Sequence, residues 1–288
     1  MDRELGLAGR VIVKKDAGGF EAKLVHIKRP LLRVPNLCIH LQSGEERAAF
    51  KVNKETHLEP VLALVAESLN KGGEGEEGDA RHAPELIRIL AEELGCKPSA
   101  IQDMELSLCD TQDGRCWGAN NEFLSSPRLD NQIHCYSSMA ALINYGAKKD
   151  LVDADVDVSV IALFDHEEVG SQSAVGAGSP IMKEAVGRIA SCFRQPADDE
   201  VYGTVVAKSF MFSADVAHAI HPNYAGKHES GHQPVLNKGT VIKTNSNQRY
   251  ATNSISGFFC REIARKAGVG VQEFVVRQDC PCGTTIGR

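Results

Sequence analysis

The first part of the chain, as far as Gly118, has the hydrophobic pattern of a small sheet with few helices. Residues 7–14 and 23–28 are rich in β-branched side chains and flank a glycine-containing turn, which predicts a β-hairpin. Polar and apolar residues alternate over 104–109, which predicts another strand. Residues 37–42 have the composition of a short strand as well. We therefore expect a β-rich segment here.

Two helices are predicted in the same part of the chain. Apolar residues recur at helical spacing over residues 58–69. Residues 84–94 begin with a proline, which is favoured in the first turn of a helix, and Gly95 supplies a stop. The acidic, glycine-rich run at 72–79 has no apolar residues with which to pack, so we expect a surface loop there.

The pattern changes after Gly118, where apolar strands begin to alternate with amphipathic helices. This alternation is typical of a parallel or mixed α/β sheet. The predicted strands cover residues 158–164, 209–213, 240–244 and 274–276, and the predicted helices start at Asp130-Asn131, Ser179-Pro180 and Ser254. We expect an α/β fold in which a partial sheet carries helices on both faces.

Acidic side chains follow the ends of these predicted strands. The sequence IALFDHEEVG at 161–170 places three carboxylates and one imidazole directly after a run that has the length of a buried strand. Charges beside a core are strongly disfavoured unless a cation or a hydrogen-bond donor compensates them, and a metal ion can do so. Asp215 follows another predicted strand, and Asp130 precedes a helix. Since ligands bind at the carboxyl ends of strands in open α/β sheets, we expect these residues to converge.

This set of side chains suits a two-metal hydrolase. Two divalent ions about 3.5–4 Å apart are held by a bridging carboxylate and by terminal ligands, and together they activate a water molecule. Asp130 is a candidate bridge, Glu168 and Asp215 are candidate terminal ligands, and Glu167 is a candidate general base. The alternative interpretation of Glu167 and Glu168 is a solvated pair in a turn.

Composition narrows the possible partners and compartments. The net charge of −6 and the pI near 5.9 argue against a nucleic-acid or anionic-membrane surface. No apolar stretch approaches the ~20 residues of a membrane span. Nine scattered cysteines favour reduced thiols and a cytoplasmic location, and Cys280-Pro-Cys282 alone is a weak signal for metal.

Long strings in the sequence carry a resemblance to a known family. The chain resembles the aspartyl aminopeptidase family in PRLDN at 127–131, FDHEEVGSQSA at 164–174, SADVAHAIHPNY at 213–224, GTVIKTNSNQRYATN at 239–253 and DCPCGTTIG at 279–287. The resemblance implies a dinuclear zinc exopeptidase that removes N-terminal Asp or Glu from peptides. It also implies a β-rich dimerisation domain with two helices over residues 5–121, a catalytic domain over 122–288, and a dimer-based tetrahedral dodecamer.

The resemblance also implies roles for individual residues. Asp130 becomes the carboxylate shared by two zinc ions, and Glu168 and Asp215 become ligands of one zinc each. Glu167 becomes the general base. The resemblance also assigns Asp215 a contact with the substrate, in addition to its role as a zinc ligand. In the family, two further histidine ligands lie outside the matching segment, so we expect a chain truncated at both ends whose zinc affinity is weakened.

Four further residues are implied to contact the substrate. His218 would lie near the metals, Lys243 would face the acidic side chain of the substrate, and Tyr250 would line the same pocket. His40 would reach into the site of a neighbouring subunit. From the residues alone, His40 also suits an ordinary position at a strand edge, and Lys243 an edge lysine that covers a strand. His218 and His221, three residues apart, are expected on one face of a helical turn.

Three functions follow from these residues. The first is a zinc aminopeptidase for acidic N-terminal residues, and the second is a catalytically inactive, truncated homologue that acts as an oligomerising or interaction protein. The third, a two-metal hydrolase of small amides, shares the aspartate and glutamate elements but is disfavoured by the sequence around Lys243 and Tyr250. Uncovered strand edges and apolar surface are expected of a truncated sheet.

Overall fold

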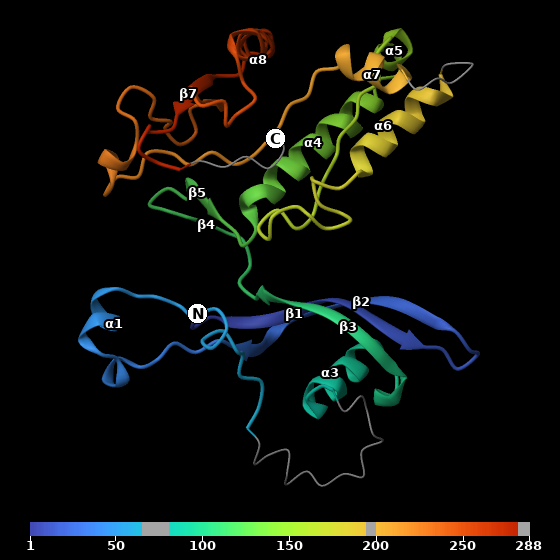
Figure 1. The fold of residues 1–288 in the computed structure, drawn as a ribbon, viewed down its shortest axis with the longest axis vertical. Helices are drawn as coiled ribbons and strands as arrows, with labels where there is room; N and C mark the ends of the chain where they lie inside the picture. Colours follow the sequence, from blue (N-terminus) through green and yellow to red (C-terminus); the bar gives the residue numbers. More distant parts are fainter. Residues whose placement is uncertain (65–80, 194–199, 282–288) are drawn as a thin grey trace. The chain divides into compact units, whose positions relative to one another are not determined.

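The computed structural model describes residues 1–64, 81–193 and 200–281. The chain divides into two compact units, Met1–Pro127 and Arg128–Arg288 (Figure 1). The division lies close to the boundary expected between residues 121 and 122. Each unit is described by itself below.

The first unit is built around a three-stranded antiparallel sheet. Its strands are β1 (Glu4–Lys14), β2 (Phe20–Arg33) and β3 (Ile101–Asp110), in the order β2-β1-β3. The predicted hairpin is confirmed, and Gly18 and Gly19 in its turn have φ values of +89° and +82°, which favour glycine. The strand predicted at 104–109 is confirmed as part of β3.

One face of this sheet carries the core of the unit. Along β1 the side chains of Leu7, Val11 and Val13 are buried at alternate positions. Helix α3 (Pro84–Leu94) packs on this face and contributes Leu90, which is fully buried (Figure 1). Proline in its first turn and a left-handed Gly95 at its end match the sequence prediction.

The remaining elements of the first unit are short. They are η1 (Ile39–Leu41), α1 (Gly44–Ala48), η2 (Pro98–Ala100), β4 (Arg115–Trp117) and β5 (Phe123–Ser125). The predicted strand at 37–42 is wrong, because the chain forms one 3-10 turn there. The predicted helix at 58–69 is wrong over residues 58–64, where Val61 instead bridges to Arg33; residues 65–69 and the acidic run at 72–79 lie outside the described residues.

The second unit contains a parallel pair of strands joined through a helix. Strand β6 (Thr240–Thr244) leads to α8 (Ser254–Ala267) and then to β7 (Val271–Val275) (Figure 1). The side chain of Asn253 accepts hydrogen bonds from the first turn of α8, and a left-handed Gly268 ends the helix. These three elements confirm the predicted strand at residues 240–244 and the predicted helix that starts at Ser254, and they place the last strand close to its predicted position.

Five helical segments are the other regular elements of this unit among the described residues. They are α4 (Leu129–Gly146), α5 (Lys149–Ala154), α6 (Ile181–Cys192), α7 (Glu200–Ala207) and η3 (Ala225–Lys227). The helices expected after Asp130-Asn131 and after Ser179-Pro180 are α4 and α6. None of the described helices is long and apolar enough to cross a membrane.

Two predicted strands of the second unit are wrong. Residues 158–164 and 209–213 run without regular secondary structure, and Val158, Phe210 and Phe212 are exposed. An apolar run becomes a strand only when a neighbouring strand satisfies its backbone groups, and in the described part of the chain neither segment has such a partner. The fold is therefore a mixed helix and sheet fold with small sheets, and residues 1–64, 81–193 and 200–281 do not form the larger sheet covered on both faces.

Candidate active site

Asp130 lies in a turn in front of the regular part of α4. The backbone at Asp130 has φ −84° and ψ 113°, and that at Asn131 has φ −114° and ψ 25°, so neither residue is helical. The peptide bond between them is cis. Both residues belong to the turn that enters the helix, and the Asn131 side chain bonds to Ala214 outside the helix and to His134 within it.

The carboxyl group of Asp130 lies near enough to that of Asp215 for the two groups to interact. Partial loss of solvent raises the pKa of Asp130, the negative charges of Asp215 and Glu167 raise it further, and Lys243 acts in the opposite direction. Two carboxyl groups held near each other can bind a divalent cation, because the cation supplies the positive charge that the pair lacks. The charges of Asp215 and Glu167 thus act on Asp130, and the role of the three residues at a metal stays a prediction.

Lys243 supplies the positive charge beside this pair. Its Nζ lies 3.5 Å from Oδ2 of Asp215 and 6.0 Å from the centre of the Tyr250 ring. The side chain is only 24% exposed, and its role, as a substrate contact or as an edge lysine that covers a strand, stays a prediction. Strand β6 fixes its position, since Lys243 is paired in register with Phe274 of β7.

His218 is held next to the same strands by aromatic contacts. Its ring centre lies 4.9 Å from that of Phe274 and 5.2 Å from that of His228. Loss of solvent lowers the pKa of His218, and the charges of His228 and Lys243 lower it further, which favours a neutral imidazole. The predicted helical turn through His218 and His221 is wrong, because residues 211–220 have no regular secondary structure.

A closed loop from Asp165 to Ser179 presents Glu167. The amide of Asp165 donates to the carbonyl of Val175 at 3.1 Å, and the amide of Gly178 donates to the carbonyl of Ser171 at 2.9 Å. Ser171 is buried, and a Cβ on Gly176 would lie 2.3 Å from the Ser171 carbonyl oxygen, so only glycine fits there without a shift.

Asp165 and His166, which directly precede Glu167, shape this loop. The Asp165 carboxylate accepts from the His166 amide at 2.8 Å, and His166 has a φ of +60°. The ring Nδ1 of His166 lies 2.7 Å from the Ser173 hydroxyl, which ties the start of the loop to its middle. Their polar groups are thus used within the loop itself.

Two predicted site residues are not joined to this group. Glu168 is exposed, and the charges that act on Asp130 come from Asp215, Glu167 and Lys243. His40 lies in η1 of the first unit, where it is exposed. Its role toward a neighbouring subunit stays a prediction, as does the role of Glu168 as a ligand.

Zinc suits the chemistry of the convergent carboxyl groups, but the ligand set is incomplete. Within residues 1–64, 81–193 and 200–281, no group of three or more His, Cys, Asp or Glu side chains is arranged to hold a metal ion. The pair of Asp130 and Asp215 supplies two of the donors that a tetrahedral zinc site needs. The remaining donor atoms have to be supplied by described side chains that move toward the pair, or by groups other than the described side chains.

Sequence reasoning missed three residues around this group. Asn131 donates from Nδ2 to the carbonyl of Ala214 at 2.7 Å, and its Oδ1 lies 2.7 Å from Nδ1 of His134. His228 contacts His218 and accepts from the backbone amide of His221 at 3.0 Å. The signals available were the position of Asn131 directly after Asp130 and the concentration of histidines after residue 217.

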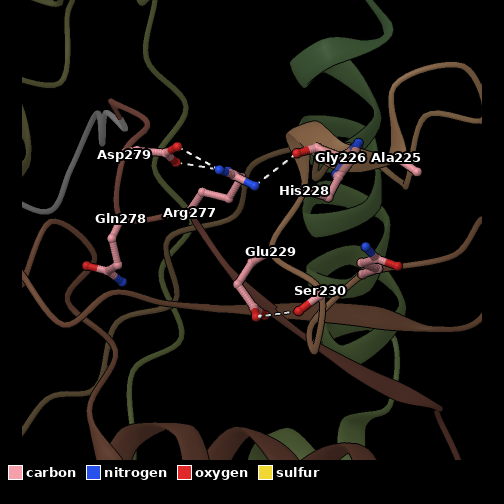
Figure 2. A pocket seen from close by; sticks show the side chains of 9 residues that line it. Ala225, Gly226, His228, Glu229, Ser230, Arg277, Gln278 and Asp279 are labelled. Atoms are coloured by element: carbon pink, nitrogen blue, oxygen red, sulfur yellow. Dashed lines mark hydrogen bonds and ion pairs between the residues drawn. The ribbon is translucent and has the colours of Figure 1, made fainter.

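An open pocket of about 620 Å³ lies beside His228 (Figure 2). Its lining is polar and includes Glu229, Arg277 and Asp279. Arg277 donates to both carboxylate oxygens of Asp279 and to the carbonyl of Gly226 at 2.9 Å, and the guanidinium lowers the pKa of Asp279 to about 2. His228 therefore connects the pocket wall to the ring of His218.

The fold and these residues place the chain in a known class of peptidases. The model of the aminopeptidase I zinc metalloprotease family (M18) matches residues 1–288, so the chain belongs to this family. It is 45% identical over 309 residues to a probable aspartyl aminopeptidase of Ricinus communis and 40% identical over 308 residues to the aspartyl aminopeptidase of Dictyostelium discoideum. Both alignments cover 99% of this chain, but only 62% and 63% of those relatives.

Solved structures show the same fold. A structure of the Ape4 and Nbr1 complex contains a chain with 42% sequence identity and a TM-score of 0.90, and the match covers 99% of this chain and 55% of that chain. A structure of the S. cerevisiae mApe1 dodecamer matches with 29% identity and a TM-score of 0.77, over 96% of this chain and 58% of that one. The chain thus spans about three fifths of the length of these proteins.

Proposed function

We propose that the protein is a zinc-dependent aminopeptidase that releases N-terminal Asp or Glu from peptides. The observation that carries the proposal is the arrangement of two interacting carboxyl groups, those of Asp130 and Asp215, beside the ammonium group of Lys243. The carboxyl groups suit a divalent cation, and the ammonium group suits the acidic side chain of a substrate. The names of the relatives support the same substrate class.

Asp130 and Asp215 would hold the metal in this proposal, with Glu168 as a further ligand after movement of its exposed side chain. When bound, zinc polarises a carbonyl group and lowers the pKa of a water molecule. Glu167, whose charge acts on Asp130, would take a proton from a water molecule in the site. Two zinc ions require more donor atoms than these residues supply. The binding of two ions is therefore itself a part of the proposal.

The substrate side of the proposal rests on Lys243. A partly buried ammonium forms a charge-assisted hydrogen bond with a carboxylate, and such bonds are stronger than neutral ones. Tyr250 forms a wall beside Lys243, and His218, kept neutral, can exchange hydrogen bonds with a peptide group. Asp215 lies between the metal-binding and substrate-binding parts, and His40 is assigned to the site of a neighbouring subunit.

We extend the proposal to the assembly and the compartment. The related mApe1 forms a dodecamer, which supports a dimer-based homo-oligomer for this chain, with the first unit as its dimerisation domain. Strands β2 and β3 are the edges of the sheet in that unit, and edge strands are common sites of association. A cytoplasmic location is supported by the free thiols of the cysteines in the described part of the chain.

A second candidate function is favoured by one observation. The described residues contain no group of three metal-ligating side chains, and apolar residues such as Val158 and Phe212 are exposed. Both features fit a catalytically inactive homologue that acts as an oligomerising or interaction protein. In that case the carboxyl pair would remain without a catalytic role.

Turnover of a chromogenic amide separates the two functions. The purified 288-residue chain, supplied with zinc, should hydrolyse the p-nitroanilide of aspartate faster than that of leucine. Glu167→Gln should abolish the hydrolysis, whereas the matched variant Glu184→Gln, on the exposed surface of α6, should retain it. Absence of turnover in the wild-type chain, with zinc present, would reject the aminopeptidase and favour the interaction protein.

A further inference from the structure

Asn131 links two segments that are far apart in the sequence. Its Nδ2 donates a hydrogen bond of 2.7 Å to the carbonyl oxygen of Ala214, which lies 83 residues further along the chain. Asn131 directly follows Asp130, and Ala214 directly precedes Asp215. The hydrogen bond therefore joins the chain neighbours of Asp130 and Asp215.

His134 fixes the orientation of this amide. The Oδ1 atom of Asn131 lies 2.7 Å from Nδ1 of His134. Because the amide nitrogen donates to Ala214, the amide oxygen has to be the acceptor in this second contact, and Nδ1 carries the hydrogen. His134 belongs to the regular part of α4, so the helix holds the imidazole in place.

A role for these residues in the stability of α4 alone does not account for the contacts. The backbone of Asn131 is not helical, and its amide nitrogen bonds to a carbonyl outside the helix. By contrast, Ser137 and Ser138, one turn later, donate to carbonyl groups within α4. The Asn131 and His134 side chains differ from these in joining the helix start to the segment that carries Asp215.

We propose that Asn131 and His134 are positioning residues that set the separation between the Asp130 and Asp215 carboxyl groups. Asn131 and Ala214 are each bonded directly to one of the two aspartates, so a shift at Asn131 or Ala214 passes directly to its carboxylate neighbour. The part of this proposal that concerns metal binding rests on the proposed function. Residues that support metal ligands from outside typically change metal affinity by about 10- to 100-fold when they are replaced.

Hydrogen exchange of the metal-free, 288-residue chain tests the link without any metal. Asn131→Ala and His134→Phe should speed exchange in a peptide that spans residues 212–217, because the tether to Ala214 is lost or loosened. His134→Gln should restore slow exchange, since its amide can donate to Asn131 Oδ1. Gln132→Ala, the neighbouring exposed side chain, is the matched control and should leave exchange unchanged. Equal exchange in Asn131→Ala and in the wild-type chain would overturn the proposal.

Zinc affinity, measured by competition with a chromophoric chelator, tests the consequence for the site. Asn131→Ala should weaken zinc binding by about tenfold or more, and Gln132→Ala should not weaken it. If exchange near Ala214 increases while zinc affinity stays the same as in the wild type, the positioning role is overturned. If the wild-type chain binds no zinc, the proposed function fails, and the exchange measurement alone still decides whether the tether holds the two segments together.

Discussion

Replacement of Gly176 by alanine should open the loop that presents Glu167. An alanine Cβ at this position would lie 2.3 Å from the Ser171 carbonyl oxygen, whereas real Cβ contacts essentially never fall below 3.0 Å. The obstructing atoms belong to the backbone, so they cannot rotate away as a flexible side chain would. Ser171 and Gly176 therefore have to separate by at least about 0.7 Å, the difference between 3.0 and 2.3 Å.

This separation acts on the start of the loop. The amide of Ser171 donates to the carbonyl of His166 at 2.9 Å, and His166 directly precedes Glu167. Misplacement of a catalytic group by about 1 Å can lower the rate by about 100-fold, so we expect a loss of this order in kcat/KM. Crowding of this kind also destabilises a fold by about 1–3 kcal/mol.

The assay combines turnover with hydrogen exchange. The kcat/KM for the aspartyl p-nitroanilide should fall in Gly176→Ala, and exchange over residues 165–179 should become faster. Gly203→Ala is the matched control, since it lies in α7 and a Cβ there meets nothing within 4 Å. Unchanged exchange in Gly176→Ala would refute the closed loop, and faster exchange with unchanged kcat/KM would refute the role of Glu167 as the base.

Three other predictions follow from the two units. Lys243→Met should reduce the preference for aspartyl over leucyl p-nitroanilide by about 10- to 100-fold, which the ratio of the two kcat/KM values measures, because a hydrogen bond to a charged group contributes about 1.5–3 kcal/mol. Leu90→Ala should destabilise the first unit by about 2–5 kcal/mol in urea unfolding, whereas Leu24→Ala, at an 81% exposed position, should change it by less than about 0.5 kcal/mol. The lowered pKa of Asp279 means that its carboxylate stabilises the fold above the ordinary pKa of about 4 and loses this effect as the pH falls to about 2. A carboxyl NMR titration should therefore place its midpoint near 2 in the wild-type chain and near 4 in Arg277→Gln, and equal midpoints would contradict the pairing.

Elements with strong local signals were predictable from the sequence. Strand β6 matches its prediction at both ends, and α3 and α8 end at glycines that the sequence marks as stops. These elements depend on capping residues, turn glycines and periodicity, all of which lie within one short stretch of chain. Local information was sufficient for them.

Elements that depend on distant partners were not predictable in the same way. Residues 158–164 and 209–213 have the composition of buried strands, yet a strand also needs a neighbour to satisfy its backbone. Residues 37–42 form a 3-10 turn despite their apolar alternation. Composition reports how well a segment suits a sheet, whereas pairing depends on the rest of the fold.

The candidate site, like the fold, was predictable from the sequence only in part. The family resemblance and the predicted strand ends indicated Asp130, Asp215 and Lys243 as site residues, and the structure brings these three together. The supporting contacts of Asn131 with Ala214 and His134 could not be read from the sequence, because a hydrogen bond across 83 residues leaves no local pattern. The role of Asn131 became visible only in the folded chain.

Zinc binding by the metal-free chain, measured by isothermal titration calorimetry, tests the central claim most directly. The Asp130 and Asp215 pair should bind zinc, and Asp130→Asn should remove this binding because it deletes a carboxylate from the pair. Asp150→Asn, at an exposed position in α5, should bind zinc as the wild-type chain does. Zinc binding that is absent from the wild-type chain, or that survives in Asp130→Asn, would contradict the account.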